Sequence, residues 1–363
     1  MVKTTLWWGT YPPLGLGTPV GHGEGVFRQD GASTALAVEF DAPSFVAAHP
    51  RLPLLYAVSE SPASALHVID VAGAGRVIVS VPTGGIDACH ILLAPDASVA
   101  YVSHYGSGDV AVVLLSDDGL PVDGAPQQLI GHVGSGPRAD RQEGPHAHFA
   151  AFAPGADYVL VADLGTDELR RYRVESSGML GEAGIATTLP PGSGPRHLAV
   201  RGELIYLVCE LDHRLRTLRW SPNDAAADVI ADVPTTAAPH RTGNDIYDAH
   251  VAVVPGTARD VLLVSVRGAD VISLFDLSPE GEARYRTSLD VGEWPRYFAV
   301  IGDRLHVGAE RGHEVRAYDL AAVLALPQEN AVGAIAALPY DTAKVTSPAC
   351  VAAAPPSPPT THA

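Results

Sequence analysis

The stretch RQEGPHAHFAAF, residues 141–152, brings together side chains that can carry acid–base chemistry. His146 and His148 stand two residues apart at the start of an apolar run, so on one strand they would face the same way. Imidazole titrates near neutral pH, which suits proton transfer and substrate binding. Structural hydrogen bonding and metal ligation are the alternatives, and the second is weakened because no further ligands show the usual local spacing.

A second candidate is Glu210, which follows the apolar run LIYLV. A carboxylate in such surroundings is costly unless a cation lies beside it. Arg196 or Arg267 could supply that cation. Two interpretations stay open from the residues alone: a functional carboxylate held by arginine, or a structural ion pair.

The candidate residues lie within an internal repeat of the sequence. A segment that starts with a small or polar residue, runs apolar and turns at Pro or Gly appears six times, at intervals of 45 to 58 residues. Each copy is followed by a short β-rich run, then an alternating strand, and then a fourth strand. Four antiparallel strands per roughly 50 residues are typical of a propeller blade. We take as equivalent the positions Phe45, His90, His148, His197, His250 and Tyr297.

The two ends of the chain supply the pieces of a seventh blade. Residues 4–11, 25–30 and 34–40 resemble strands two, three and four with no first strand before them. Residues 347–353 resemble a first strand with nothing after it. Pairing these segments closes the ring and removes the exposed sheet edges.

The predicted fold is therefore all-β: a seven-bladed β-propeller with four antiparallel strands per blade. It forms a single domain, residues 1–353, whose shared blade combines residues 3–40 with 347–353. Residues 354–363 are rich in Pro and Thr and are expected to be a disordered tail.

In a propeller, the start of each first strand and the end of each second strand meet at one mouth of the central channel. His, Arg and Glu recur at these positions, which predicts a mouth that binds something polar. The longest segments leading into first strands, residues 131–144 and 236–248, enter there and are interpreted as pocket walls. Asp163 is interpreted as a turn former. Glu60 and Glu310, at the same position of the repeat, are not selected as site residues either.

The composition of the chain disfavours several classes of binding partner. The net charge of −17 disfavours nucleic acid and anionic membranes as ligands. The N-terminal residues lack the features of a signal peptide, and no apolar run has membrane-spanning length, so a soluble cytoplasmic protein is expected. Three scattered cysteines, Cys89, Cys209 and Cys350, predict buried free thiols and neither disulfides nor a metal site.

The motifs RQEGPHAH, DLGTD and GSGPRH, together with DAHVAV and EWPRYFAV, resemble those of the lactonase family of seven-bladed propellers. That family includes the propeller-type 6-phosphogluconolactonase and the carboxy-cis,cis-muconate cyclase. The resemblance spans essentially the whole chain and implies a metal-independent site at the channel mouth. This chain departs from the family pattern by having Cys209 before Glu210 and Val266 before Arg267, where Asn is usual.

The resemblance places the family's functional histidine on His148, with His146 beside it, and its other functional residues on Arg196, Glu210 and Arg267. We expect the arginines to hold an anionic group and to stabilise the oxyanion formed when a ring carbonyl is attacked. His148 would act as general base or acid, and Glu210 would orient an arginine or share the proton transfer. The catalytic candidates are thus His148, Glu210, Arg196 and Arg267. The substrate-binding candidates are His146, Arg141, Tyr105, His90, His197, His250 and Arg296.

The expected function is hydrolysis of a small polar or anionic lactone of the sugar-acid type, without a cofactor, by a monomer or weak homodimer. A lactonising cyclase or isomerase of the muconate-cyclase type is the first alternative, because hydrolysis and cyclisation differ only in fine placement. A non-catalytic propeller that binds a ligand is the second, because a fold alone does not imply catalysis. For His90, His197 and His250, hydrogen bonding that locks the blades together is the alternative to substrate binding.

Overall fold

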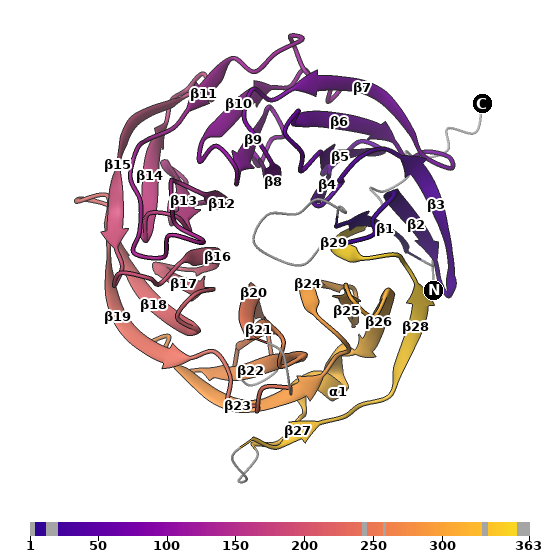
Figure 1. Ribbon diagram of the computed structural model, residues 1–363, viewed down its shortest axis with the longest axis vertical. Coiled ribbons are helices and arrows are strands. Elements are labelled where there is room, and N and C mark those ends of the chain that lie inside the picture. Colours follow the sequence, from indigo (N-terminus) through magenta and orange to yellow (C-terminus); the bar gives the residue numbers. More distant parts are fainter. Residues whose placement is uncertain (1–3, 12–20, 242–244, 257–258, 329–332, 354–363) are drawn as a thin grey trace.

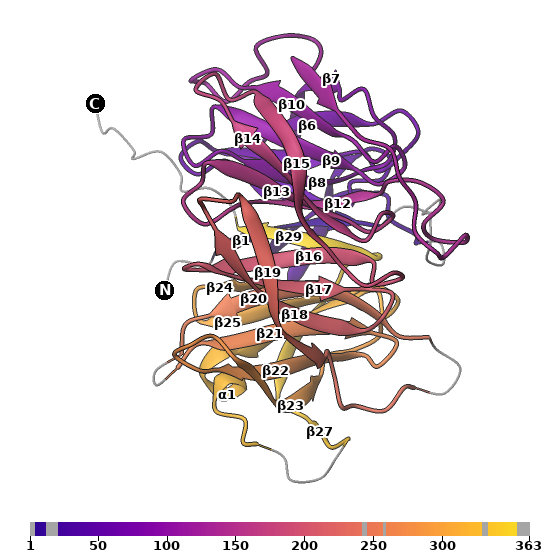
Figure 2. The ribbon, with the colours of Figure 1, turned by 90° about the vertical axis from the view of Figure 1, so that its left-hand side faces the viewer.

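The computed structural model describes residues 4–11, 21–241, 245–256, 259–328 and 333–353. Seven antiparallel sheets stand around a central channel, each with its first strand nearest the channel and its fourth on the outside (Figure 1). Seen from the side, the inner strands run roughly along the channel axis (Figure 2). The predicted seven-bladed propeller is confirmed.

Blades one to four follow each other along the chain, each with four consecutive strands. Blade one contains β4 (Val46–Ala48), β5 (Leu54–Val58), β6 (Ala65–Asp70) and β7 (Arg76–Pro82). Blade two contains β8 (Ala88–Leu93), β9 (Val99–His104), β10 (Val110–Leu114) and β11 (Gln128–Ile130). Blade three contains β12 (Ala147–Phe152), β13 (Tyr158–Asp163), β14 (Glu168–Val174) and β15 (Leu180–Thr188). Blade four contains β16 (Pro195–Arg201), β17 (Leu204–Cys209), β18 (Arg214–Ser221) and β19 (Ala226–Pro234).

Blades five and six include the elements that the sequence pattern did not locate. Blade five contains β20 (Tyr247–Val254), β21 (Val261–Arg267), β22 (Val271–Leu277) and β23 (Ala283–Asp290), and β27 (Ile335–Ala336) adds a short parallel strand to β23. Blade six contains β24 (Pro295–Ile301), β25 (Arg304–Ala309), β26 (Glu314–Asp319) and β28 (Tyr340–Lys344). The short helix α1 (Leu320–Leu324) follows β26 and is capped by Asp319, whose carboxylate accepts from the Ala322 amide at 2.8 Å.

Blade seven closes the ring as predicted. Its strands are β29 (Pro348–Ala353), β1 (Thr5–Thr10), β2 (Gly25–Asp30) and β3 (Ser33–Glu39), in that order across the sheet. The antiparallel pairing of β29 with β1 joins the two ends of the chain, for example Leu6 opposite Ala353. The expected tail, residues 354–363, lies outside the described residues.

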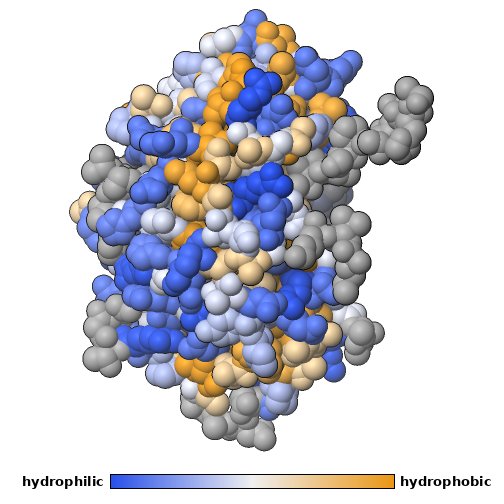
Figure 3. All heavy atoms as spheres, turned by 90° about the vertical axis from the view of Figure 1, so that its right-hand side faces the viewer, coloured by the Kyte–Doolittle hydropathy of each residue, from blue (hydrophilic) through white to orange (hydrophobic). Residues whose placement is uncertain are grey.

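The core lies between neighbouring blades. The second strands β5, β9, β17 and β21 are buried at every residue, because other sheets cover both of their faces. The outer strands β7 and β19 instead alternate between exposed and partly buried residues. On the side of the ring that carries β3 and β28, the surface is mostly hydrophilic with apolar side chains among the polar ones (Figure 3). No helix among the described residues is long and apolar enough to cross a membrane.

The first strands share an irregularity that shapes the channel mouth. Near its start, each of β8, β12, β16 and β24 has one residue more than its partner strand, so the register shifts there. Such a β-bulge redirects a side chain out of the regular alternation. The extra residues are Cys89, His148, Arg196 and Arg296.

The bulges correct the repeat alignment made from sequence. By strand register, His90 and His197 correspond to Phe149 and not to His148. His148 corresponds instead to Arg196, the extra residue of β16. The sequence alignment was wrong here because an inserted residue shifts the two-residue period of a strand by one position.

Candidate active site

Glu210 lies at the centre of a buried ion cluster at the channel mouth. It follows β17, and its Oε1 accepts from Arg141 Nη2 at 2.6 Å. Its Oε2 lies 2.6 Å from Arg267 Nη2 and 2.9 Å from Arg196 Nε. All four side chains are less than a tenth exposed. We call Glu210, Arg141, Arg196 and Arg267 the arginine cluster.

The surroundings of Glu210 decide what its carboxylate can do. Burial by itself raises the pKa of a carboxyl group, but the charges of Arg267, Arg141 and Arg196 together hold the pKa of Glu210 well below its usual range. Both carboxylate oxygens are occupied by guanidinium groups. Glu210 is therefore suited to orienting the arginines and not to exchanging a proton at neutral pH.

The segment before β12 forms one wall of the mouth. Its Gln142 is fully buried, and the amide donates to the Leu164 carbonyl at 2.9 Å and to Asp167 Oδ1 at 2.7 Å. This anchor holds Arg141 against Glu210. On the other side, a Glu143 oxygen lies 3.3 Å from His146 Nε2. Arg141, Gln142 and Glu143 thus have distinct structural roles.

Positive charge exceeds negative charge in the arginine cluster. Three guanidinium groups face one carboxylate, which leaves two positive charges uncompensated within the cluster. Burial and the nearby charge of Arg267 lower the pKa of Arg196 to about 9. Among the described residues, the buried Nε of Arg141 finds no hydrogen-bond acceptor. Buried cations with unused donors favour an anionic ligand.

His148 and His146 have different surroundings. The His148 ring lies edge-on to Tyr105 and His197, with ring centres 5.6 and 5.2 Å apart, and its Nδ1 has no hydrogen-bond partner among the described residues. Burial and then Arg196 hold the pKa of His148 well below its usual value, so its ring is neutral. His146 stacks on Tyr105 at 4.4 Å, and its Nδ1 donates to the Tyr105 carbonyl at 2.6 Å. His148 faces the site, whereas His146 supports Tyr105.

Two small cavities lie between these side chains, with volumes of about 30 and 20 Å³. Each has room for about one or two water molecules, whereas pockets for small ligands typically measure about 300–1,000 Å³. Both cavities are lined by Tyr11, Glu60, His148, Arg196 and Arg296.

Next to the cavities, six rings close the channel in an unbroken circle, with centre-to-centre distances of 4.0 to 5.8 Å between neighbours. The circle runs through Phe45, His90, Phe149, His197, His250 and Tyr297. His197 and His250 join through their Nδ1 atoms at 2.9 Å. His90 and His250 line neither small cavity, whereas His197 lines the larger one. This geometry favours the blade-locking interpretation for His90 and His250.

The ring histidines make stability depend on pH. Burial lowers the pKa of His90 to about 3, against about 6.5 in an unfolded chain. Between these values the unfolded chain binds the proton and the folded chain does not, so stability falls as the pH is lowered. In urea unfolding from pH 6 to pH 4, we expect His90→Phe to make this fall shallower by about 1.4 kcal/mol per pH unit. The exposed His240→Phe is the control, and equal slopes in His90→Phe and the wild type would contradict the assignment.

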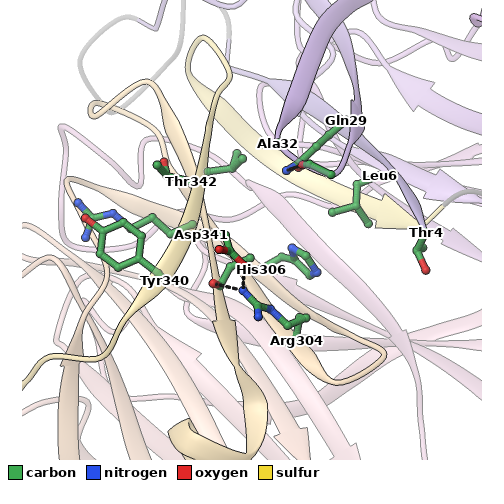
Figure 4. A pocket seen from close by; sticks show the side chains of 13 residues that line it. Thr4, Leu6, Gln29, Ala32, Arg304, His306, Tyr340, Asp341 and Thr342 are labelled. Carbon is green, nitrogen blue, oxygen red and sulfur yellow. Dashed lines mark hydrogen bonds and ion pairs between the residues drawn. The ribbon is translucent and has the colours of Figure 1, made fainter. Parts of the chain in front are cut away.

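A larger hollow of about 450 Å³ lies elsewhere, between blades six and seven (Figure 4). It is lined near the end of the strands opposite the mouth, for example by Arg304 at the start of β25 and Thr4 just before β1. Arg304 is already paired, with the Ala317 carbonyl at 2.6 Å and with Asp341 at 2.5 Å. This hollow contains none of the arginine cluster.

Comparison with known proteins agrees with the fold. The sequence model described as "Lactonase, 7-bladed beta-propeller" matches residues 26–334. The chain belongs to the lactonase family. It is 29% identical to the 6-phosphogluconolactonase of Bacillus subtilis over 275 residues, which are 72% of this chain and 75% of that one. The expected membership of this enzyme family is thereby confirmed.

Solved lactonase-like propellers share the architecture. A putative 6-phosphogluconolactonase from Bacteroides fragilis superposes with a TM-score of 0.78 at 22% identity, covering 97% of this chain and 98% of that one. The periplasmic gluconolactonase of Pseudomonas aeruginosa gives a TM-score of 0.76 at 23% identity, covering 97% and 99%. At these identities the likeness establishes the fold.

The two departures from the family pattern leave the arginine cluster intact. Cys209 packs in the hydrophobic core between blades three and four, and Val266 packs in the core between blades four and five. Glu210 and Arg267 are oriented by each other and by the remaining arginines.

Glu60 and Tyr11 line the site, although they were not among the residues predicted to form it. Both occupy the same repeat position as Glu210, at the end of a second strand, and Glu60 lines both small cavities. The signal was present in the repeat, but Glu60 was rated no higher than the turn former Asp163 at the equivalent position. Asp163 does form a turn, because one of its carboxylate oxygens accepts from the amides of His146, Gly165 and Thr166.

Proposed function

We propose that the protein hydrolyses a small lactone that carries a carboxylate or phosphate group, of the kind represented by 6-phosphogluconolactone. The observation that carries this proposal is the excess positive charge of the arginine cluster, buried in a protein whose net charge is −17. An anionic substrate would neutralise that excess and use the free Nε donor of Arg141. The name of the Bacillus subtilis relative supports the same substrate class.

In the proposed reaction, water adds to the ring carbonyl and the ring C–O bond then breaks. The guanidinium of Arg196, which lines both cavities, stabilises the negative charge that develops on the carbonyl oxygen. The neutral His148 accepts a hydrogen bond from the attacking water and positions it. Glu210 keeps the three arginines in place throughout.

The reaction is proposed to need no metal ion. A divalent cation would be repelled by the uncompensated charge of the arginine cluster. The part of the chain that the structure describes contains no group of three His, Cys, Asp or Glu side chains arranged to hold a metal.

A substrate panel tests this function. Ring opening of 6-phosphogluconolactone, gluconolactone and a muconolactone would be followed by pH-stat titration against the spontaneous rate, with and without EDTA. We expect the phosphorylated lactone to be opened at least about tenfold faster than neutral gluconolactone, because one extra ion pair easily exceeds 1.4 kcal/mol in a buried site. EDTA should change nothing. Absence of any rate above the spontaneous one, or loss of activity with EDTA, would contradict the proposal.

A further inference from the structure

Glu60 is a second carboxylate at the site, and its surroundings differ from those of Glu210. It follows β5, as Glu210 follows β17, and its amide donates to the Ala42 carbonyl at 2.8 Å. Its side chain lines both small cavities together with His148 and Arg196, and it is partly exposed. No ion pair joins Glu60 to any residue that the structure describes.

Of the arginines near Glu60, Arg296 has the largest electrostatic effect on it. Arg296 is paired with Glu310. Burial therefore dominates and raises the pKa of Glu60 to about 7, while the Ser44 hydroxyl and Arg296 oppose the rise. Such a carboxyl group populates both its charged and its neutral form at neutral pH. A group that first accepts and then returns a proton needs this property.

Three titratable groups that line a cavity with Glu60 keep one charge state between pH 6 and pH 8. Arg196 has a pKa of about 9, that of His148 is held well below its usual value, and burial keeps that of Cys89 well above its own. Burial also raises the pKa of Asp87, but this carboxyl lines neither cavity. Asp87 lies near Glu60, and the charged and titratable groups that line a cavity with it are Tyr11, Cys89, Tyr105, Arg141, His148, Arg196, His197, Glu210, Arg267, Arg296 and Tyr297.

From this placement we infer that Glu60 is the proton-transfer residue of the site, a role distinct from the anchoring role of Glu210. The inference rests on the proposed lactone hydrolysis. As the carboxylate, Glu60 takes a proton from the water whose oxygen bonds to the ring carbonyl carbon. As the carboxylic acid, it then gives that proton to the ring oxygen as the C–O bond breaks. The product is the open hydroxy acid, and Glu60 returns to its starting form.

The decisive measurement is the pH dependence of kcat/KM for 6-phosphogluconolactone between pH 5 and pH 9. The phosphate of the substrate itself ionises near pH 6. We expect the wild type to show a further ionisation near pH 7, and Glu60→Gln to be slower by about 10²–10⁴-fold with only the phosphate ionisation left. Glu60→Asp should recover part of the rate. The matched control is Glu168→Gln, because Glu168 is partly buried, is paired with Arg170 at 2.9 Å and lines neither cavity. A Glu60→Gln protein with the wild-type rate and pH profile would overturn the inference.

A binding measurement separates this inference from the proposed function. Gluconate keeps a constant charge from pH 5.5 to pH 8.5, so calorimetric titration with gluconate reports changes in the protein. We expect wild-type affinity to fall several-fold as Glu60 becomes negative, and the affinity of Glu60→Gln to stay constant. If the wild type opens no lactone, the proposed function fails, and loss of this pH dependence in Glu60→Gln still supports Glu60 as the ionising group. An identical dependence in both proteins would overturn it.

Discussion

Glu210→Gln is expected to lower the free energy of unfolding by about 3–5 kcal/mol, because it leaves buried guanidinium groups without their shared counter-charge. The amide keeps the size of the side chain but removes the negative charge that Arg141, Arg196 and Arg267 surround. Repulsion among three buried cations then adds to the lost hydrogen bonds. Urea unfolding at pH 7 measures the loss.

Sulfate provides the internal check on that explanation. An anion that binds the three guanidinium groups in place of the lost carboxylate should stabilise Glu210→Gln more than it stabilises the wild type. Asp260→Asn serves as the matched control, because Asp260 forms a half-exposed pair with Arg201 at 2.6 Å. That pair should be worth no more than about 1 kcal/mol. A loss below 1 kcal/mol in Glu210→Gln, with no effect of sulfate, would show that the arginine cluster does not depend on this carboxylate.

Arg196→Met should have the opposite profile, with a large effect on catalysis and a small one on stability. Arg196 lines both cavities, and removal of one donor to a developing oxyanion typically lowers kcat/KM by about 10²–10³-fold. Stability should change by no more than about 1 kcal/mol, because the substitution removes an uncompensated buried charge and replaces it with apolar volume. Steady-state kinetics on 6-phosphogluconolactone and urea unfolding would be compared.

Arg216→Met is the matched control for Arg196→Met. Arg216 is equally buried in the same blade but is paired with Asp212 at 2.5 Å and with Asp232 at 3.4 Å, and it lines neither small cavity. Its loss should reduce stability and leave kcat/KM of the folded protein unchanged. If Arg196→Met retained wild-type kcat/KM, Arg196 would have no part in the reaction.

The assignment of the two glutamates explains why a single site needs both. Glu210 is held ionised by the arginine cluster, so it stabilises an arrangement of positive charge that would attract the proposed anionic substrate. Glu60 lacks such a partner and keeps a pKa of about 7, so it can change its protonation state during a reaction cycle. Environment, and not residue type, separates the two roles.

The repeat determined the architecture from sequence alone. Apolar segments at regular intervals predicted sheets that bury one another's faces. Strands without partners at both ends of the chain predicted the pairing of β1 with β29 that closes the ring. The same regularity brought Glu210, Arg196 and Arg267 to one mouth, because equivalent positions of a closed ring meet at one end. Family motifs added the expectation of lactone chemistry, which the family match confirmed.

Only the tertiary structure decided how the individual side chains meet. The extra residue at His148 and at Arg196 turns these side chains into the cavities and leaves His90 and His250 in the closing ring of aromatic side chains. The different partners of Glu60 and Glu210 likewise arise from blades far apart in the chain. Spacing in a sequence specifies which face of a strand a residue occupies, but a bulge and a pKa depend on atoms that only folding brings together.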